Sequence, residues 1–380
     1  MLQQYNKNNS FIKKWWRSID QQIIIALIIL FSFSLILVTT SGSIIANKLG
    51  LDEYHFSSRQ MIYLFLASLL IVIFSSFEQK WLKRIAILGF VANLILLILV
   101  KFYGYEVKGA TRWISIFGIS MQPSEFIKPF FAVIVGWLLS LKFEDEFPSF
   151  SICLFLYVLV AVLLILQPDF GMFVMISAVF GIQLFVSGMP LLWIILAFIV
   201  SMFGISGAYF FLPHVTKRVN NFLDPDSSEN YQVTKSLMAF EHGGMYGIGP
   251  GEGSVKQVLP DSHTDFIFAV AGEEFGAIIC LIVIGTFAFI VIRSLLKLIN
   301  ENDKFVQFAS IGIISQFGLQ SIINIGVTLN LLPTKGMTLP FISYGGSSTI
   351  AISIGIGMLL GFTKQVTSLT KYKIRDIDLE

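Results

Sequence analysis

The sequence predicts an all-α polytopic membrane protein with about ten transmembrane helices. Of its 380 residues, 55% are hydrophobic, only 13% are charged and 37 are Phe, a composition too apolar for a soluble globular domain. Apolar stretches of membrane-spanning length follow one another along the whole chain. Lys and Arg gather in alternate connections between these stretches, which is typical of cytoplasmic loops.

The apolar stretches place the expected helices, and the Lys and Arg residues orient them. The first stretch follows a basic tail and is longer than a signal peptide, so we interpret it as an uncleaved first helix. Both termini are expected in the cytoplasm, with tails at 1–21 and 364–380 around one membrane domain at 22–363. The expected spans are 22–46, 60–77, 84–101, 124–142, 150–167, 170–187, 189–212, 266–292, 305–332 and 348–363.

This topology turns three segments outward: 102–123, a large extracytoplasmic loop at 213–265 between the seventh and eighth helices, and 333–347. These segments carry most of the unusual polar residues, so any chemistry is expected outside the cytoplasm. Cys153 and Cys280 lie within apolar helices, which indicates core packing and neither a disulfide framework nor a thiol metal site.

The first outward segment leads into a helix with a polar first turn. Ser124 follows Pro123 and is expected to cap this helix. Glu125 and Lys128 are three residues apart on one helical face, so an intramembrane ion pair is the simplest explanation. Pro129 removes the backbone donor that would bond the Glu125 carbonyl, and this opens the turn as a binding site would require. Both interpretations stay open.

Other polar residues also have a structural and a functional interpretation. Arg112 and Trp113 belong to a basic and aromatic patch that would also serve as an anchor at the lipid headgroups. Asp169 follows a proline in a tight turn and is expected to cap the next helix. Six glycines between 243 and 253 precede Lys256, a pattern that fits a loop binding an anion or one that is merely flexible.

A polar loop containing Asp261, His263 and Asp265 runs directly into an apolar helix, and we take this junction as the candidate active site. A carboxylate there is reached by water while hydrocarbon raises the cost of its charge. The alternative is that Asp265 only caps the helix. Glu273 and Glu274 follow about two turns later, where two adjacent carboxylates need partners or a wet cavity.

The ninth span carries one polar residue per turn, at Gln316, Gln320, Asn324 and Thr328. Such a stripe either hydrogen-bonds neighbouring helices or lines a polar cavity. The following segment, 331–348, is rich in Pro and Gly and cannot form a regular helix. Irregular backbone at membrane depth must be buried in protein or line a cavity.

Four segments together resemble one family: RWISIFGISMQPSEFIKP, QPDFG, HTDFIFAVAGEEFG and GMTLPFISYGGSS. These stretches, in this order, are similar to those of the SEDS (shape, elongation, division and sporulation) membrane glycosyltransferases, which polymerise lipid II into peptidoglycan. The amino-acid sequence of the last segment is more similar to the cell-division branch of this family than to the elongation branch. Two departures affect loop detail: Asp261-Ser262 replaces the usual Glu-Ala, and Glu241-His242 stands where smaller residues are commoner.

The resemblance implies that Asp265 is the catalytic carboxylate. It acts there as a general base on a sugar hydroxyl while a polyprenyl pyrophosphate leaves. The residues expected to bind substrate are Arg112, Trp113, Glu125, Lys128, Lys256, His263, Thr264 and Ser343. No protein metal ligands are assigned, although a divalent cation, Mg²⁺ or Mn²⁺, is expected at an unknown site because it would offset the charge of the leaving group.

The resemblance also implies partners and a location. The substrate is lipid II, the protein partners are a class B penicillin-binding transpeptidase and other divisome membrane proteins, and contacts with membrane lipids are expected but none with nucleic acid. The implied location of the protein is the bacterial cytoplasmic (inner) membrane, at the division septum. The alternatives are a lipid II flippase, an elongation-type polymerase and a scaffold for a partner synthase. Clustering of the candidate residues on the outer side favours an enzyme, because transporters place their sites near the midplane.

Overall fold

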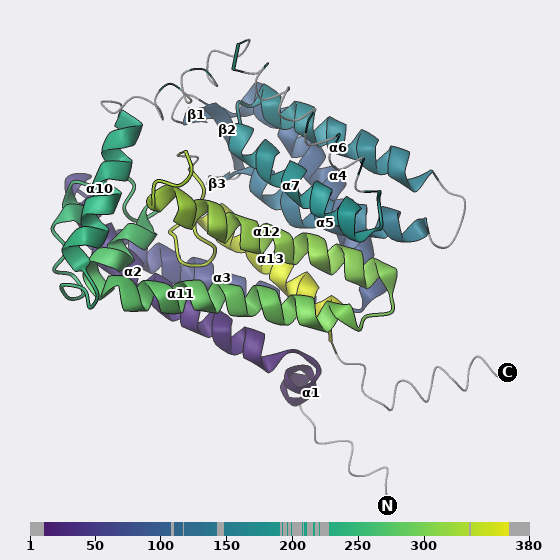
Figure 1. Ribbon diagram of the computed structural model, residues 1–380, viewed down its shortest axis with the longest axis horizontal. Coiled ribbons are helices and arrows are strands. Elements are labelled where there is room, and N and C mark those ends of the chain that lie inside the picture. Colours follow the sequence, from purple (N-terminus) through teal and green to yellow (C-terminus); the bar gives the residue numbers. More distant parts are fainter. Residues whose placement is uncertain are drawn as a thin grey trace, which may run out of the picture.

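The computed structural model describes residues 11–107, 110–116, 118–142, 148–190, 228–333 and 336–364, with a few positions between 192 and 220. Its main helices run side by side as an elongated bundle (Figure 1). Among the described residues, seven helices are long and apolar enough to cross a membrane, and α7 and α13 are apolar but shorter. The seven are α2 (Gln21–Lys48), α3 (His55–Ser76), α4 (Gln79–Tyr103), α5 (Pro123–Leu141), α6 (Ser149–Leu166), α11 (Ile267–Ile299) and α12 (Lys304–Thr328); the two shorter helices are α7 (Phe170–Val186) and α13 (Gly346–Phe362).

These helices coincide with every expected span except 189–212, which lies almost wholly outside the described residues. The prediction of a helical polytopic membrane protein is confirmed. Residues 1–10 and 365–380 of the expected tails also lie outside the described part of the chain. A short helix, α1 (Phe11–Ser18), lies within the expected N-terminal tail.

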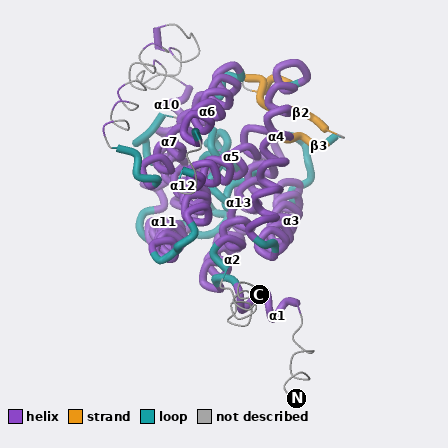
Figure 2. The backbone as a smooth tube through the Cα atoms, turned by 90° about the vertical axis from the view of Figure 1, so that its right-hand side faces the viewer, coloured by secondary structure: helices purple, strands orange, loops and turns teal. Residues whose placement is uncertain are grey.

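The bundle has a central helix that the others surround (Figure 2). In the most apolar window of α5, 83% of the residues are buried, compared with 28% in α3, α4, α6 and α11. Close packing of α5 on α12 depends on Gly136, where a Cβ would collide with the backbone of Ala309. The central position explains why the charged first turn of α5 is enclosed by protein and not by lipid.

The described parts of two segments that were expected to be loops contain helices and strands. Segment 102–123 contains a three-stranded antiparallel sheet in the order β1-β2-β3, formed by β1 (Tyr105–Val107), β2 (Ala110–Ile116) and β3 (Ile119–Met121). The loop 213–265 contains α10 (Ser228–Gly243) and a single 3₁₀ turn, η1 (Val255–Gln257). The strands are short and α10 lacks strong hydrophobic periodicity, so these elements gave little signal in the sequence.

Helix α11 is broken at Gly276, which has φ 78° and ψ 178°. The glycine segment after α10 packs into this break, where Ala277 N donates to the Gly244 carbonyl at 2.9 Å. A Cβ on Gly247 would collide with the Glu274 carbonyl. The glycines therefore permit backbone to approach backbone and satisfy the polar groups that the break frees.

Candidate active site

Asp265 lies just before the first turn of α11 and is half-buried. The helix begins at Ile267 with Phe266 in the N-cap position, so Asp265 is not the cap that the alternative interpretation required. Its carboxylate faces the Pro- and Gly-rich segment, because a Cβ built on Gly336 would stand 3.5 Å from Oδ2 of Asp265. The carboxylate thus lies at a meeting point of two irregular segments.

Asn324 of α12 joins these two segments through one amide group. Its Nδ2 donates to the Asp265 carbonyl at 2.8 Å and to the Met337 carbonyl at 2.6 Å. Asn324 is buried, so water does not compete for these bonds. Asn324 was predicted as part of a polar stripe, but nothing in the sequence indicates that it binds the backbone of Asp265.

The segment 339–345 packs against the residues that precede Asp265. Ser343 Oγ donates to the Thr264 carbonyl at 2.6 Å and accepts from Leu339 N at 2.8 Å. Tyr344 N donates to the His263 carbonyl at 2.9 Å. The structure thus brings three of the expected site residues, His263, Thr264 and Ser343, into direct contact.

Aromatic rings surround His263 on the outer side of the bundle. Its ring centroid lies 4.8 Å from that of Phe56 and 5.5 Å from that of Tyr344. Gln60, one turn along α3 from Phe56, donates to the Ser343 carbonyl at 3.3 Å. The sequence analysis missed the contribution of α3, since Phe and Gln in an apolar span carry no distinctive signal.

Glu125 and Lys128 form the ion pair expected from their spacing, with Nζ of Lys128 2.7 Å from Oε2 of Glu125. Lys128 also donates to Oε1 of Gln320 at 2.8 Å, and its side chain is only 2% exposed. Gln316 of α12 donates to the Lys128 carbonyl. The cavity beside the pair measures about 20 Å³, which is room for about one water molecule.

The polar stripe of α12 carries this network toward Asp265. Gln320 Nε2 donates to the Thr338 carbonyl at 3.0 Å and to Ser348 Oγ at 3.2 Å. Thr338 follows Met337, which Asn324 holds. The stripe therefore bonds neighbouring elements, as the first of its two interpretations predicted.

Arg112 and Asp169 form a further pair at the outer end of the bundle, with Nη1 and Oδ1 3.5 Å apart. Asp169 also accepts from Ser124 Oγ at 3.0 Å. Ser124 is not the expected cap, because the N-cap position of α5 is Gln122. Asp169 does occupy the N-cap position of α7, as expected, but its side chain makes no capping hydrogen bond there. The Asp169 carboxylate instead binds Ser124 and Arg112, because a charged partner gives a stronger bond than a neutral N–H. Trp113 lies next in β2 and pairs in register with Tyr105 of β1.

Lys256 belongs to a second polar cluster, further along α11. Its Nζ contacts Oε1 of Glu274 and donates to the Gly251 carbonyl at 2.9 Å, with 2% of the side chain exposed. Glu273 accepts from the backbone N of Val255 at 2.7 Å and of Lys256 at 3.0 Å. Lys256 is thus engaged by the protein and is not directed into open space.

The described residues contain no group of three or more His, Cys, Asp or Glu side chains that could hold a metal ion. A divalent cation here would depend on few protein ligands, such as the single carboxylate of Asp265, and on ligands from substrate and water.

The sequence and the fold both have known relatives. A model of the FtsW, RodA and SpoVE proteins, described as cell cycle protein, matches residues 20–368. A probable peptidoglycan glycosyltransferase FtsW from Caulobacter vibrioides is 39% identical over 92% of this chain and 90% of its own length. The probable FtsW of Coxiella burnetii is 36% identical over 90% of this chain and 95% of its own length.

Solved structures share the architecture. One similar chain belongs to a solved structure described as structural coordination of polymerization and crosslinking by a peptidoglycan synthase complex. The TM-score is 0.75 with 24% identity, and the match covers 92% of this chain and 98% of that one. The rod shape determining protein RodA of Thermus thermophilus gives a TM-score of 0.69 with 23% identity, over 92% and 97% of the two chains. At these identities the likeness speaks for the fold alone.

Proposed function

The chain belongs to the FtsW, RodA and SpoVE family of multi-pass membrane proteins, and we propose that it is a peptidoglycan glycosyltransferase that polymerises lipid II on the outer face of the cytoplasmic membrane. The relatives named above carry the name FtsW, which favours a role in septal wall synthesis during cell division over an elongation role. The observation that carries the assignment is the half-buried Asp265 at the outer end of α11, whose backbone carbonyl is held by Asn324 and whose carboxylate faces Gly336.

This geometry suits a general base. A sugar hydroxyl is a weak nucleophile, so a carboxylate within hydrogen-bond reach accelerates its attack. Asp265 takes the proton of the acceptor 4-hydroxyl as that oxygen forms a bond to the donor's anomeric carbon. The bond from the anomeric carbon to the pyrophosphate oxygen breaks at the same time, and its electron pair leaves with the polyprenyl pyrophosphate. A direct displacement inverts the anomeric centre, so an α-linked donor gives a β-linked glycan.

The leaving pyrophosphate needs positive charge nearby. Arg112 is the candidate among the expected site residues because it lies at the outer end and its Nε is buried without a hydrogen-bond partner. Lys128 is less suited, since its side chain is only 2% exposed and is bound by both Glu125 and Gln320. A hydrated Mg²⁺ or Mn²⁺ would supply further charge, with Asp265 and the phosphate oxygens as its ligands.

The main alternative was a flippase that moves lipid II across the bilayer. A transported disaccharide needs a polar path through the bundle, but the cavity beside Glu125 and Lys128 measures about 20 Å³ and holds about one water. The intramembrane charges thus brace the bundle and do not line a path for a sugar. A scaffold without activity would have no need of the Asp265 geometry.

A class B penicillin-binding protein is the proposed partner, because glycan polymerisation must be coupled to peptide crosslinking outside the membrane. A chain of a peptidoglycan synthase complex shares the fold, which supports this proposal. We also propose other divisome membrane proteins as partners and the division septum as the location. Co-purification from native membranes in mild detergent tests the complex, and repeated isolation without any transpeptidase would contradict it.

Polymerisation by the Asp265→Asn variant tests the function directly. Asn is nearly isosteric with Asp but cannot accept the proton. Purified protein is incubated with lipid II, with and without the class B penicillin-binding protein, and polymer is measured on gels. We expect the wild type to polymerise and the variant to lose at least about 10²-fold in rate while it still folds and binds lipid II. A folded Asp265→Asn protein with near wild-type rate would refute the assignment.

A further inference from the structure

At the end of α11 opposite the candidate active site, two cations depend on the same carboxylate. Asp20, the N-cap of α2, accepts from Nε of Arg293 at 2.8 Å and lies 2.8 Å from Nζ of Lys297, so two cations share one buried carboxylate. Arg293 and Lys297 keep 33% and 28% of their side chains exposed. Among the described residues, the Nη groups of Arg293 have no hydrogen-bond partner.

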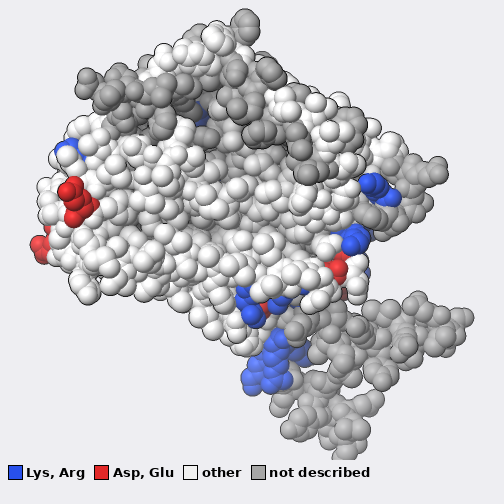
Figure 3. All heavy atoms as spheres, in the orientation of Figure 1, with Lys and Arg blue, Asp and Glu red and all other residues white. Residues whose placement is uncertain are grey.

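Helix α1 adds three more cations beside this pair. Lys13, Lys14 and Arg17 are all exposed. The helix is fixed to the bundle through Trp15, whose Nε1 donates to Ser75 Oγ of α3 at 2.8 Å. Basic residues gather along this lower edge of the molecule in the space-filling view (Figure 3). By the charge distribution along the chain, this edge faces the cytoplasmic leaflet.

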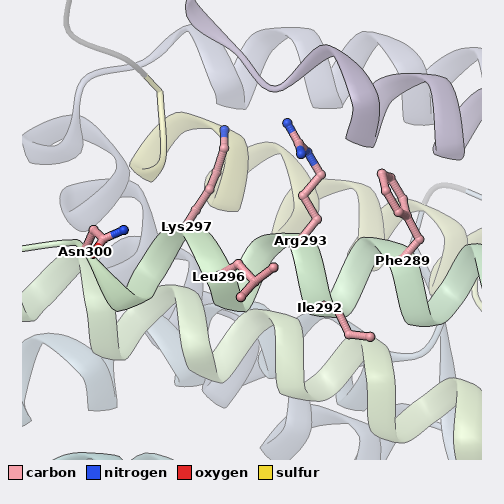
Figure 4. Close-up of a pocket in the computed structure, with 6 residues that line it drawn as sticks. All are labelled: Phe289, Ile292, Arg293, Leu296, Lys297 and Asn300. Carbon is pink, nitrogen blue, oxygen red and sulfur yellow. The ribbon is translucent and has the colours of Figure 1, made fainter.

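An open, shallow groove of about 520 Å³ runs along α11 beside these charges, and all the residues that line it come from α11 and its C-cap. Phe289, Arg293 and Lys297 form one row at four-residue spacing, and Ile292, Leu296 and Asn300 form the next. Figure 4 shows Arg293 and Lys297 extending side by side from one side of α11, with Ile292 and Leu296 on the adjacent side. The groove therefore combines a cationic end with an apolar length.

We propose that this groove binds an anionic phospholipid of the inner leaflet. The lipid phosphate contacts Lys297 and the Nη groups of Arg293, and an acyl chain lies along Phe289, Ile292 and Leu296. Basic pockets beside membrane helices on the cytoplasmic side recognise anionic head groups in this way. With Lys13, Lys14 and Arg17 of α1, the cations of this edge outnumber its carboxylates, which include Glu301 and Asp303 besides Asp20. This excess favours a lipid of net negative charge over a zwitterionic one.

Native mass spectrometry of the full chain in detergent tests the site. Phosphatidylglycerol and phosphatidylcholine with identical acyl chains are titrated in parallel, and the bound lipids are counted. The wild type should retain phosphatidylglycerol in clear preference to phosphatidylcholine. Lys297→Gln leaves Asp20 paired with Arg293 and so keeps the fold, but it should lower the preference about fivefold, as expected for one surface cation.

Two further variants keep the test decisive. The triple variant Lys13→Gln, Lys14→Gln, Arg17→Gln changes only exposed side chains and should lower the preference further, by about fivefold per charge. Lys304→Gln is the matched control, an exposed cation on the same face that contacts Gln307 and does not line the groove, and it should lower the preference less than Lys297→Gln does. Equal binding of the two lipids by the wild type, equal losses in Lys304→Gln and Lys297→Gln, or a lipid-free dimer showing a second copy in the groove would each overturn the proposal.

Discussion

Two buried Lys–Glu pairs support the outer half of this bundle, and they are built differently. Lys128 and Glu125 lie three residues apart on α5, whereas Lys256 and Glu274 are joined from the glycine segment to α11. Both lysine side chains are 2% exposed. The first pair continues through Gln320 toward the segment that faces Asp265, while the second fastens a surface segment to the break in α11.

The difference separates two uses of buried charge. A buried pair gives little net stability, since desolvation offsets the attraction, but loss of one partner is costly. Lys128 also donates to a neutral amide, so its removal disturbs a hydrogen-bond network that leads to the active site. Lys256 donates otherwise only to the exposed carbonyl of Gly251, which water can satisfy. The first pair should therefore be indispensable and the second replaceable.

The largest effect is expected at Glu125 and Lys128. Each single alanine substitution leaves a buried charge unpaired and should cost about 3–5 kcal/mol. Thermal stability in detergent is measured for both single variants and for the double variant. The double variant should lose much less than the sum of the single losses, because the second substitution removes the charge that the first left unpaired. Strictly additive losses would show that the two residues are not a direct pair.

The next effect concerns Asn324, which positions Asp265 from below. Asn324→Leu removes both hydrogen bonds but fills a similar volume, and it should shift the carboxylate enough to lower kcat by about 10²-fold. Binding of lipid II should change little, so the loss lies in kcat and not in KM. Thr328→Val, one turn along α12, is the control, because its Oγ1 bonds only within its own helix, to the Ile325 carbonyl. Similar losses in both variants would mean that Asn324 acts on the fold in general.

A smaller effect should follow when the second pair is replaced as a whole. Lys256→Met alone leaves Glu274 unpaired and is destabilising, but Lys256→Met with Glu274→Leu should return to within about 1 kcal/mol of the wild type. Polymerisation should recover along with stability. The corresponding apolar replacement of Glu125 and Lys128 should not recover, since Oε1 of Gln320 would be left without its donor. Recovery in both pairs would remove the distinction between them.

The same contrast explains what the sequence could predict. Hydrophobic spans and the Glu125–Lys128 pair depend on local spacing, and both were correctly inferred. The partners of Lys256 and Asp169 are distant in sequence, so Asp169 was correctly placed at the N-cap of α7 but the bonds of its side chain were not predicted. The glycines after 243 were interpreted as a flexible or anion-binding loop, because nothing local shows that they pack into the break at Gly276.

The smallest effect is expected for Asp20 and its two cations, because these ion pairs are partly exposed to water. Burial alone would raise the pKa of Asp20, but hydrogen bonds from Arg293 and Lys297 outweigh it and hold the pKa below its ordinary value. A carboxylate with a lowered folded-state pKa adds stability above its unfolded pKa of about 3.9 and loses it as pH falls through the folded value. Because both cations are partly exposed, the contribution should be modest, about 0.5 kcal/mol, and weaker in high salt.

The Asp20→Asn variant isolates the contribution of the Asp20 charge to stability, since Asn keeps the capping bonds to Gln22 N and Ile23 N but carries no charge. Thermal unfolding of the wild type and the variant is compared at pH 7 and pH 3, at low and high salt. The two proteins should differ at pH 7 in low salt, and the difference should shrink as the pH falls below about 3.9 toward the lowered pKa of the Asp20 carboxyl. Salt should reduce the difference at Asp20 but leave the Glu125–Lys128 coupling unchanged, because that pair is enclosed and counterions do not reach it. Equal salt dependence at the two sites would mean that burial does not distinguish them.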